Sequence, residues 1–533
     1  MLRSATLLAT LIRKELLAIR KELLANLLTM RLAVALAFTV LLTVLTAFIG
    51  SLEYSHNWDR YELERQKYEQ KISEVTVWNQ LEPMLFVAPQ PLSILSRGLS
   101  DGASAHYTVF LHWMSVTPHP ITTADTDLMQ SLVRIDFTTV VAILLSFLAI
   151  VLGYDAICGE RERGTLQLLL ANSVPRSTVV LGKLIGGLLS IWIPLALAFV
   201  VALLILLANP DVTFTGDDWF RLIGLFLISC LFLGQVFALS LAVSACSRDS
   251  ATSLIVCLFF WLIAGVGILN VAPSLARYGV DEPPFFEFLQ QDRELWDEYN
   301  GLIEAWENKN PRPDDSYFKG LQAKGRMRYH HPLAYEWQAR RNGFALEKRL
   351  EASDRRFKIF RANQMPLAEE ALLVDKWSVA SPMVTYQVLS YQLARTTLAD
   401  NLYLANNAHR WRTDYYDWLR GKGVFADRSF FTDDLPHQEP LIPDPLSLSP
   451  DDAAPDSEYM RGRMAWMQQE EERRTSNATG LDLTDLPKVG TDLRRDLAAS
   501  LTEMVPGLAV LLLSFGACVM LVMMRFLTYD PGR

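Results

Sequence analysis

A charged segment enclosed by two apolar runs is the feature that most constrains this chain. The segment reads Glu160-Arg161-Glu162-Arg163, and the apolar runs on either side end at Leu152 and begin near Leu181. A helix of about 20 apolar residues crosses a bilayer, so the charged piece must emerge at a membrane face. It is too short to form a domain. A short amphipathic helix there can contact only something that docks from outside the membrane.

Six apolar runs of spanning length occur in the sequence. They predict an all-α membrane protein with six transmembrane helices. The first 30 residues lack the small-residue cleavage site that follows the apolar core of a secretory signal peptide. The net charge of −9 argues against a nucleic-acid partner. The expected spans are 31–51, 134–155, 181–208, 220–245, 251–273 and 504–527.

Lysine and arginine gather in short segments that would face one side of the membrane. They are frequent in residues 1–31 and 160–183, whereas the loop 209–219 has only aspartates as charged residues, with Arg221 just beyond it as a minor exception. Cytoplasmic loops carry the excess of these basic residues, so both termini are expected in the cytoplasm. The segments 52–133 and 274–503 are then expected on the outer side.

This orientation gives a complete domain organisation. Residues 1–30 form a cytoplasmic amphipathic interfacial helix, and the two outer segments assemble into a mainly helical domain. The full set of expected parts is 1–30 as the interfacial helix, 31–51 as the first span, 52–133 as an outer segment, 134–273 as spans two to five with a cytoplasmic loop at 156–180, 274–503 as the large outer domain, and 504–533 as the last span with a cytoplasmic tail.

The first 30 residues contain a six-residue motif that is repeated after seven residues. Arg13-Lys14-Glu15-Leu16-Leu17-Ala18 recurs seven residues later as Arg20-Lys21-Glu22-Leu23-Leu24-Ala25. A shift of seven residues returns to nearly the same helical face, so the basic pairs align. A basic amphipathic helix beside a span is typical of a helix that lies on membrane lipid. Two roles remain open for it: a simple topogenic anchor, or a surface that binds a partner.

The outer domain must fold without disulfides. All five cysteines lie in expected spans or on the cytoplasmic side, so no disulfide framework is available outside. Residues 283–375 and 384–420 are helical by pattern, and 435–457 is an expected exposed loop. The aromatic-rich stretch 386–418 is more often a helix core than a site for a peptide, lipid or glycan.

Sequence motifs of several enzyme classes are absent. The chain has no P-loop, no His-Glu-x-x-His, no Gly-x-Ser-x-Gly and no cysteine pair at metal-binding spacing. His112, Met114 and His119 form a set that copper would accept, although polar residues are common in any loop. The central turns of the spans contain almost no charge, which argues against ion-coupled transport and indicates an external energy source.

The charged segment and the residues after it also carry a pattern that is specific to one protein family. The run Glu160-Arg161-Glu162-Arg163-Gly164-Thr165-Leu166-Gln167-Leu168-Leu169-Leu170, with Val174-Pro175-Arg176-Ser177 and Gly182-Lys183 after it, resembles the loop between the second and third spans of ABC-2 type transporter permeases. The layout resembles the gliding-motility and nitrous-oxide-reductase-maturation branch of that family. More narrowly, it resembles the subgroup with a large periplasmic insertion of unknown function.

Weaker resemblance extends into the outer segments. It is carried by Leu92-Ser93-Ile94-Leu95-Ser96-Arg97-Gly98-Leu99, by Arg134-Ile135-Asp136-Phe137, by Ser381-Pro382 and by Thr396-Thr397-Leu398. The resemblance implies a permease in the bacterial inner membrane that works as an exporter with a separate ABC ATP-binding subunit. A second permease, identical or paralogous, is also implied. ATPase activity is expected in the partner, and no catalytic residue, cofactor or metal site is expected in this chain.

The residues expected to couple the permease to its ATPase lie in the charged loop. Gly164 gives flexibility before a helix, Leu166 begins an apolar face with Leu169 and Leu170, and mixed charges suit the rim of an interface. The alternative is an ordinary connecting loop, whose basic residues reflect only the excess of Lys and Arg on the cytoplasmic side of a membrane. The expected coupling residues are Glu160, Arg161, Glu162, Arg163, Gly164, Thr165 and Leu166.

A second function remains open beside export. The large outer domain and the lack of polar residues in mid-span also suit a complex that transmits ATP-driven motion to a periplasmic or envelope protein, without moving a substrate through the bilayer. The sequence does not identify the substrate, and it does not distinguish a homodimer from a heterodimer.

Overall fold

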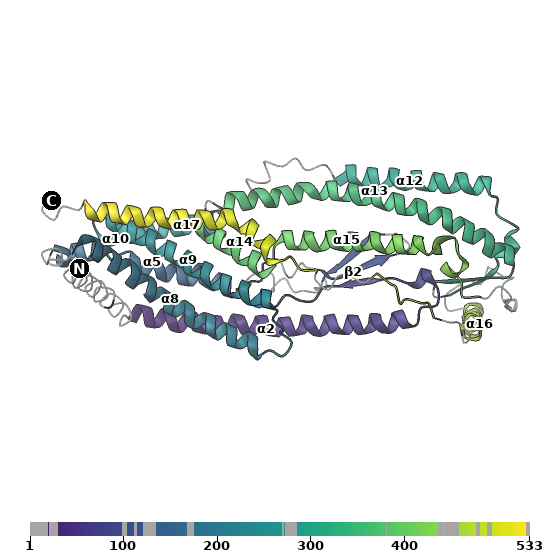
Figure 1. The fold of residues 1–533 in the computed structure, drawn as a ribbon, viewed down its shortest axis with the longest axis horizontal. Helices are drawn as coiled ribbons and strands as arrows, with labels where there is room; N and C mark the ends of the chain where they lie inside the picture. Colours follow the sequence, from purple (N-terminus) through teal and green to yellow (C-terminus); the bar gives the residue numbers. More distant parts are fainter. Residues whose placement is uncertain are drawn as a thin grey trace, which may run out of the picture.

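The computed structural model shows an elongated molecule, with apolar helices gathered at one end and polar helices and strands at the other (Figure 1). The structure describes Arg20 and residues 30–533 except 99–103, 111–114, 121–134, 168–174, 269–270, 272–284, 324, 380, 435–440, 442–457, 476–479, 488–492 and 529–533. We call the end with the apolar helices the bundle, and the end with the polar helices and strands the polar body.

Among the described residues, five helices are long and apolar enough to cross a membrane. The sixth expected span, at 251–273, is a shorter apolar helix that continues as a π-helix, Ile263–Gly267. The prediction of an all-α membrane protein is therefore confirmed. The five helical stretches are Leu32–Ser73, Phe137–Glu162, Arg176–Ala208, Gly216–Cys246 and Leu497–Leu527.

Local sequence explains where these helices begin. Thr215 accepts a hydrogen bond from the Asp218 N–H and the Asp218 carboxylate bonds back to Thr215, which makes a capping box at the start of α9. Asp249 and Asp496 cap α10 and α17 in a similar way with one side chain each. The bundle elements are α2 (Met30–Ser73), α4 (Phe137–Thr139), the π-helix Val140–Leu145, α5 (Ser146–Gly153), α6 (Cys158–Glu162), α8 (Arg176–Ala208), α9 (Gly216–Cys246), α10 (Ser250–Leu262) and α17 (Leu497–Leu527).

Glycines allow the apolar helices to pack closely. Gly153 of α5 lies against Ser240 of α9, and Gly187 of α8 lies under the ring of Phe237. Lipid tails are as apolar as the side chains, so close backbone approach at small residues drives helix association in a membrane. Gly187 therefore allows α8 to pack closely against Phe237 of α9.

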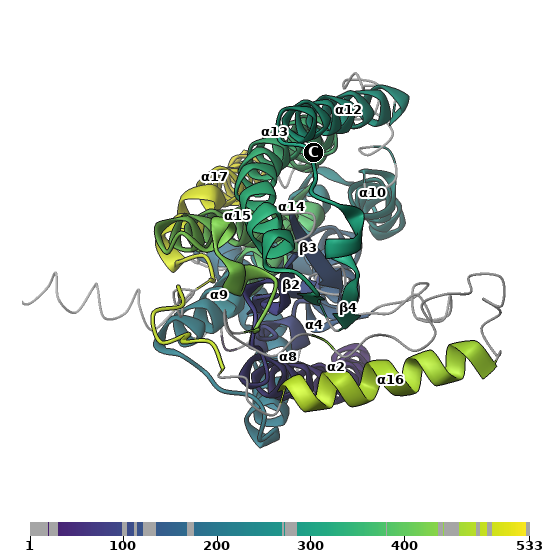
Figure 2. The ribbon, with the colours of Figure 1, turned by 90° about the vertical axis from the view of Figure 1, so that its right-hand side faces the viewer.

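The polar body combines long helices with two small antiparallel sheets. In the first sheet the strand order is β1-β2-β3, with Leu85 opposite Tyr107 and Val109 opposite Val116. α16 extends sideways across the far end of the molecule (Figure 2). The elements are β1 (Met84–Phe86), β2 (Ser104–Phe110), β3 (Ser115–Pro120), α12 (Phe285–Lys309), β4 (Gly320–Ala323), β5 (Arg326–Tyr329), α13 (Pro332–Ser378), α14 (Pro382–Ala394), α15 (Leu398–Gly421) and α16 (Glu458–Thr475).

Two helices join the polar body to the bundle. α2 runs without a break from the bundle into the polar body (Figure 1). α14 belongs to the expected outer segment, yet Met383, Tyr386 and Leu389 lie in the same apolar core as the spans. Tyr386 stacks on Phe232 in α9 at a ring distance of 4.6 Å. One helix of the polar body, α14, is therefore inserted among the spans.

A second core holds the polar body together. It contains Trp411, Tyr415 and Tyr416 of α15, packed with Tyr335 of α13 and Tyr107 of β2. These aromatic side chains are buried, as is Tyr386 in the bundle core. The interpretation of the stretch 386–418 as core-forming is therefore the one that the packing supports.

The structure also differs from the sequence-based expectations in detail. The outer segment 52–133, expected to belong to a mainly helical domain, also contains the three strands β1, β2 and β3. The expected helix 384–420 is two helices, since Arg395 adopts a left-handed conformation (φ 58°) and Thr397 starts α15 with a capping box. Of the amphipathic helix predicted for 1–30 only Arg20 and Met30 are described, and of the loop predicted for 435–457 only Leu441 is described.

We expect Gly187→Ala to destabilise the bundle. A Cβ at this position would overlap the Phe237 ring, whereas a Cβ at Gly516 of α17 would meet nothing within 4 Å. Overpacking of this kind costs about 1–3 kcal/mol, so the midpoint of thermal unfolding in detergent should fall for Gly187→Ala and stay unchanged or rise for Gly516→Ala. Equal midpoints for the two variants would contradict the packing described here.

Candidate functional site

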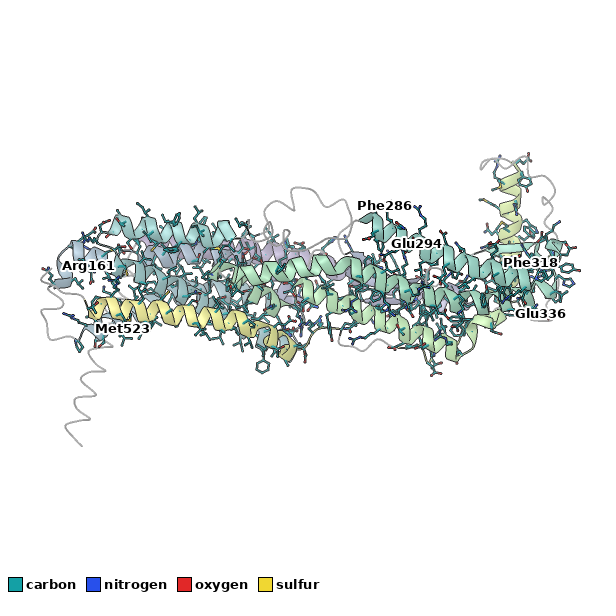
Figure 3. All side chains as sticks on the ribbon, turned by 90° about the horizontal axis from the view of Figure 1, so that it is seen from above. Arg161, Phe286, Glu294, Phe318, Glu336 and Met523 are labelled. Carbon is teal, nitrogen blue, oxygen red and sulfur yellow. The ribbon has the colours of Figure 1, made fainter. Side chains whose placement is uncertain are left out.

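The charged loop lies at the end of the bundle opposite the polar body, which we call the loop end. Arg161 and Met523 of α17 both lie at this end, while Phe318 and Glu336 lie at the far end of the molecule (Figure 3). The chain turns after Gly153 and forms the short helix α6. At Gly164 φ is +70°, and a Cβ added there would meet nothing within 4 Å. Glycine therefore permits the left-handed turn that ends α6.

Glu160 holds the loop to α8. Its carboxylate lies 2.8 Å from the Lys183 ammonium, and the Lys183 side chain is only 3% exposed. An ammonium that is removed from water needs a partner, and Glu160 supplies it. The ion pair therefore ties the loop before the third span to the first turns of that span.

Arg161 holds the loop to the end of α9. Its guanidinium donates to the Ser247 carbonyl at 2.9 Å and to the Ala245 carbonyl at 3.4 Å. The last carbonyls of a helix have no partners within the helix, and a cation also suits the negative end of the helix dipole. Arg161 therefore caps the C-terminus of α9.

Glu162 holds the loop to the start of α10. Its carboxylate accepts hydrogen bonds from the Ser250 N–H at 2.8 Å and from the Ser250 hydroxyl at 2.6 Å. The free N–H groups of a helix N-terminus favour an anion. In addition, the Ser244 hydroxyl of α9 accepts hydrogen bonds from the Ile157 and Cys158 N–H groups, each at 3.1 Å.

The remaining loop residues divide into an anchored side and an exposed side. Leu166 is completely buried and belongs to the bundle core. Arg163 bends back to donate to the Gly159 carbonyl at 2.9 Å, and Thr165 donates to the Glu160 carbonyl at 3.2 Å, while both remain exposed. Leu169 and Leu170, expected to share a face with Leu166, lie outside the described residues.

The predicted site residues are thus brought together, but with a division of roles that their spacing did not reveal. Glu160, Arg161 and Glu162 each bond to a different helix, and their expected role at the rim of an interface stays a prediction. The exposed positions of the loop include Glu162, Arg163 and Thr165. Sequence reasoning missed Ser247 and Ser250 as partners, because a hydroxyl residue in a turn carries no distinctive signal.

The described residues of the charged loop bond to three helices, α8, α9 and α10. Within the described part of the chain, no group of three or more His, Cys, Asp or Glu side chains could hold a metal ion. His112 and Met114, from the set considered for copper, lie outside the described residues. A loop bonded to α8, α9 and α10 at once can pass a force applied to its exposed side to three helices.

Known proteins resemble the first half of this chain. Residues 20–284 match the family model described as ABC-2 family transporter protein. The chain is 31% identical over 138 residues to a probable ABC transporter permease protein NosY of Pseudomonas aeruginosa, a match that covers 25% of this chain and 50% of the relative. It is 31% identical over 150 residues to a probable ABC transporter permease protein NosY of Stutzerimonas stutzeri, covering 27% and 54%. The chain therefore matches about half the length of these curated relatives.

The pair between Glu160 and Lys183 gives a sharp test of the loop geometry. We expect Glu160→Lys to lower the free energy of unfolding by roughly 3 kcal/mol, because removal of one partner leaves a buried charge unpaired. Exchange of the two residues, Glu160→Lys with Lys183→Glu, should recover most of that loss. Thermal unfolding of the purified variants measures both effects. An exchange variant no more stable than the single variant would show that the two side chains do not pair.

Proposed function

Residues 20–284 match the model of the ABC-2 family of transporter proteins, and from that premise we propose that the chain is the transmembrane permease subunit of an ABC-2 exporter. In this proposal ATP is hydrolysed by a separate ABC ATP-binding subunit, which docks on the exposed side of the charged loop. The observation that carries the proposal is the attachment of this loop to three helices through Glu160, Arg161 and Glu162.

The attachment explains how a docked subunit would act on the spans. A loose loop would absorb the movement of a partner, whereas a loop held by charge-assisted hydrogen bonds moves with the helices that hold it. Closure of two ATP-binding subunits would displace α6, and α8, α9 and α10 would follow as a rigid group. Export requires this movement to open a path between two permease copies.

The same proposal assigns location and partners. The basic loop end faces the cytoplasm of a bacterial cell, the membrane is the inner membrane, and the polar body stands on the periplasmic side. The permease works as a pair with a second copy or a paralogue. The two NosY proteins are described as probable ABC transporter permeases, which supports this assignment without naming a substrate.

A second candidate function is favoured by a specific observation. α14 of the polar body packs in the core of the bundle, and α2 continues from one part into the other. A body that is joined to the spans in this way follows their movement. The complex would then transmit ATP-driven motion to an envelope protein, and a tightly packed interface between two permease copies, with no continuous channel, would favour this function over export.

Affinity purification of the tagged full-length chain in mild detergent, followed by mass spectrometry, tests the proposal. We expect a P-loop ATPase in stoichiometric amount, together with a second permease if the pair is heteromeric. Recovery of the chain alone, or with envelope proteins only, would contradict the ATP-driven function.

A charge reversal tests whether the exposed side of the loop is the docking surface. Arg163→Glu should reduce recovery of the ATPase about tenfold or more, because it reverses a charge at the expected contact. Arg525→Glu is the matched control, since this arginine is also exposed and lies in the last turn of α17. Glu160 is unsuitable for this purpose because its reversal also breaks the pair with Lys183. Equal ATPase recovery with the two variants would exclude Arg163 from the interface.

A further inference from the structure

Segments that are far apart in the sequence meet where the polar body joins the bundle. They are the turn 395–397 between α14 and α15, the piece Ser96-Arg97-Gly98, and the residue before α4, Asp136. The hydroxyl of Thr396 donates to the Ser96 carbonyl at 3.2 Å. A Cβ on Gly98, where φ is +49°, would lie 2.6 Å from the Thr396 carbonyl oxygen. The two backbones are therefore in direct contact, with no space for sliding.

The first half of this junction binds α2 and α4. Arg97 forms an ion pair with Glu53 of α2. The Arg97 N–H donates to the Asp136 carboxylate at 2.9 Å, and the same carboxylate caps α4 by accepting the Thr139 N–H at 2.7 Å. The start of the second span and the side of the first are thus fixed to one short piece of chain.

The second half binds α9 and centres on two arginines. Arg395 pairs with Asp218 at 3.1 Å and also with Asp217. Arg221 pairs with Asp217 at 2.8 Å and has no exposed surface. The acids lie in the first turn of α9, so Arg395 attaches the turn 395–397 to the start of that helix, while the pair between Arg221 and Asp217 lies within α9.

Arg221 extends the contact to α14 and α17. Its guanidinium donates to the Leu393 carbonyl at 3.3 Å at the end of α14, to the Ser500 hydroxyl at 3.1 Å in α17, and to the Arg495 carbonyl at 3.0 Å. A planar guanidinium with five fixed donors is suited to holding several groups in one geometry. The exception noted in the positive-inside pattern is therefore a buried connector of three helices.

Stability alone does not account for this cluster. Removing charged groups from water costs free energy that their attraction only partly returns, and apolar side chains of similar volume often serve as well or better. What a buried, fully bonded ion cluster provides is a defined geometry between the elements that it joins. Here those elements are α9 and α17 on one side and the end of α14 on the other.

We propose that Arg221 and Arg395 are positioning residues of a rigid joint that holds the polar body in one orientation on α9 and α17. The joint comprises these arginines, Asp217, Asp218, the turn 395–397 and the piece Ser96-Arg97-Gly98. Any movement of α9 and α17 is passed through it to α15. The joint rests only on the geometry described here, while the ATP-driven origin of the movement rests on the proposed function.

Distance measurement between spin labels tests the rigidity of the joint. Labels at Leu402 of α15 and Leu513 of α17 are on exposed positions and report across the joint in the full chain, reconstituted in lipid nanodiscs with the five native cysteines replaced. We expect one narrow distance distribution with the native joint. The double variant Arg221→Gln with Arg395→Gln should at least double its width or add a second distance.

Two controls separate a joint from a general loss of structure. A second label pair, Leu204 of α8 with Leu513, reports only on the bundle and should keep its distribution in every variant. Arg412→Gln removes another fully buried arginine, which pairs with Asp354 in the polar body at 2.7 Å, and should leave the distance from Leu402 to Leu513 unchanged.

An unchanged narrow distribution of the distance between Leu402 and Leu513 in the double variant would overturn the proposed joint. Equal broadening of the same distance with Arg412→Gln would also overturn it. If the double variant also changes the distance distribution of the bundle pair, the single variant Arg221→Lys is measured in its place. Lysine keeps the charge but cannot hold three acceptors in a fixed plane, so we expect the distribution between Leu402 and Leu513 to broaden. A distribution of native width would overturn the joint. A separate experiment adds ATP and the purified ATPase to the labelled protein with the native joint. If neither label pair changes its distance, the ATP-driven function is contradicted, whereas the proposed joint is unaffected.

Discussion

The ion pair between Glu160 and Lys183 is the contact on which the position of the charged loop depends. Lys183 lies in the second turn of α8 and is nearly inaccessible to water, so it requires the Glu160 carboxylate that lies 2.8 Å away. Because Glu160 is held, its neighbours in α6 are held too, and Arg161 and Glu162 reach the ends of α9 and α10. One pair thus determines where the exposed side of the loop stands.

The same physical rule governs the other end of the bundle. Apolar surroundings offer no partner for a charge, so charged side chains near the spans find partners in the chain itself. At the junction with the polar body these are Arg221 and Arg395 with the acids that begin α9. Both ends of α9 are therefore fixed by ion pairs or charge-assisted hydrogen bonds, the loop at one end and the joint at the other. We propose that this helix links the two events, docking and movement of the polar body.

Much of this architecture could be predicted from the sequence, and the failures have physical causes. The spans follow from composition, since only long apolar runs suit a bilayer, and the charged loop stands out by contrast. The insertion of α14 could not be predicted, because Tyr386 and Ser390 are typical of a soluble helix until Ser229 is seen to bond to the Tyr386 hydroxyl at 2.9 Å. The partners of Arg221 and Lys183 are equally hidden, because long-range pairing leaves no periodic signal.

Site-specific photo-crosslinking from Thr165 is the most direct test of the central claim, that the exposed side of the anchored loop receives an ATP-binding subunit. A photoreactive residue at this exposed position, introduced into the full chain in native membranes, should give one dominant adduct with a P-loop ATPase. The same probe at Leu402, in the polar body, should not give that adduct. Adducts from Thr165 with other membrane proteins only, or an ATPase adduct of equal yield from Leu402, would contradict the account.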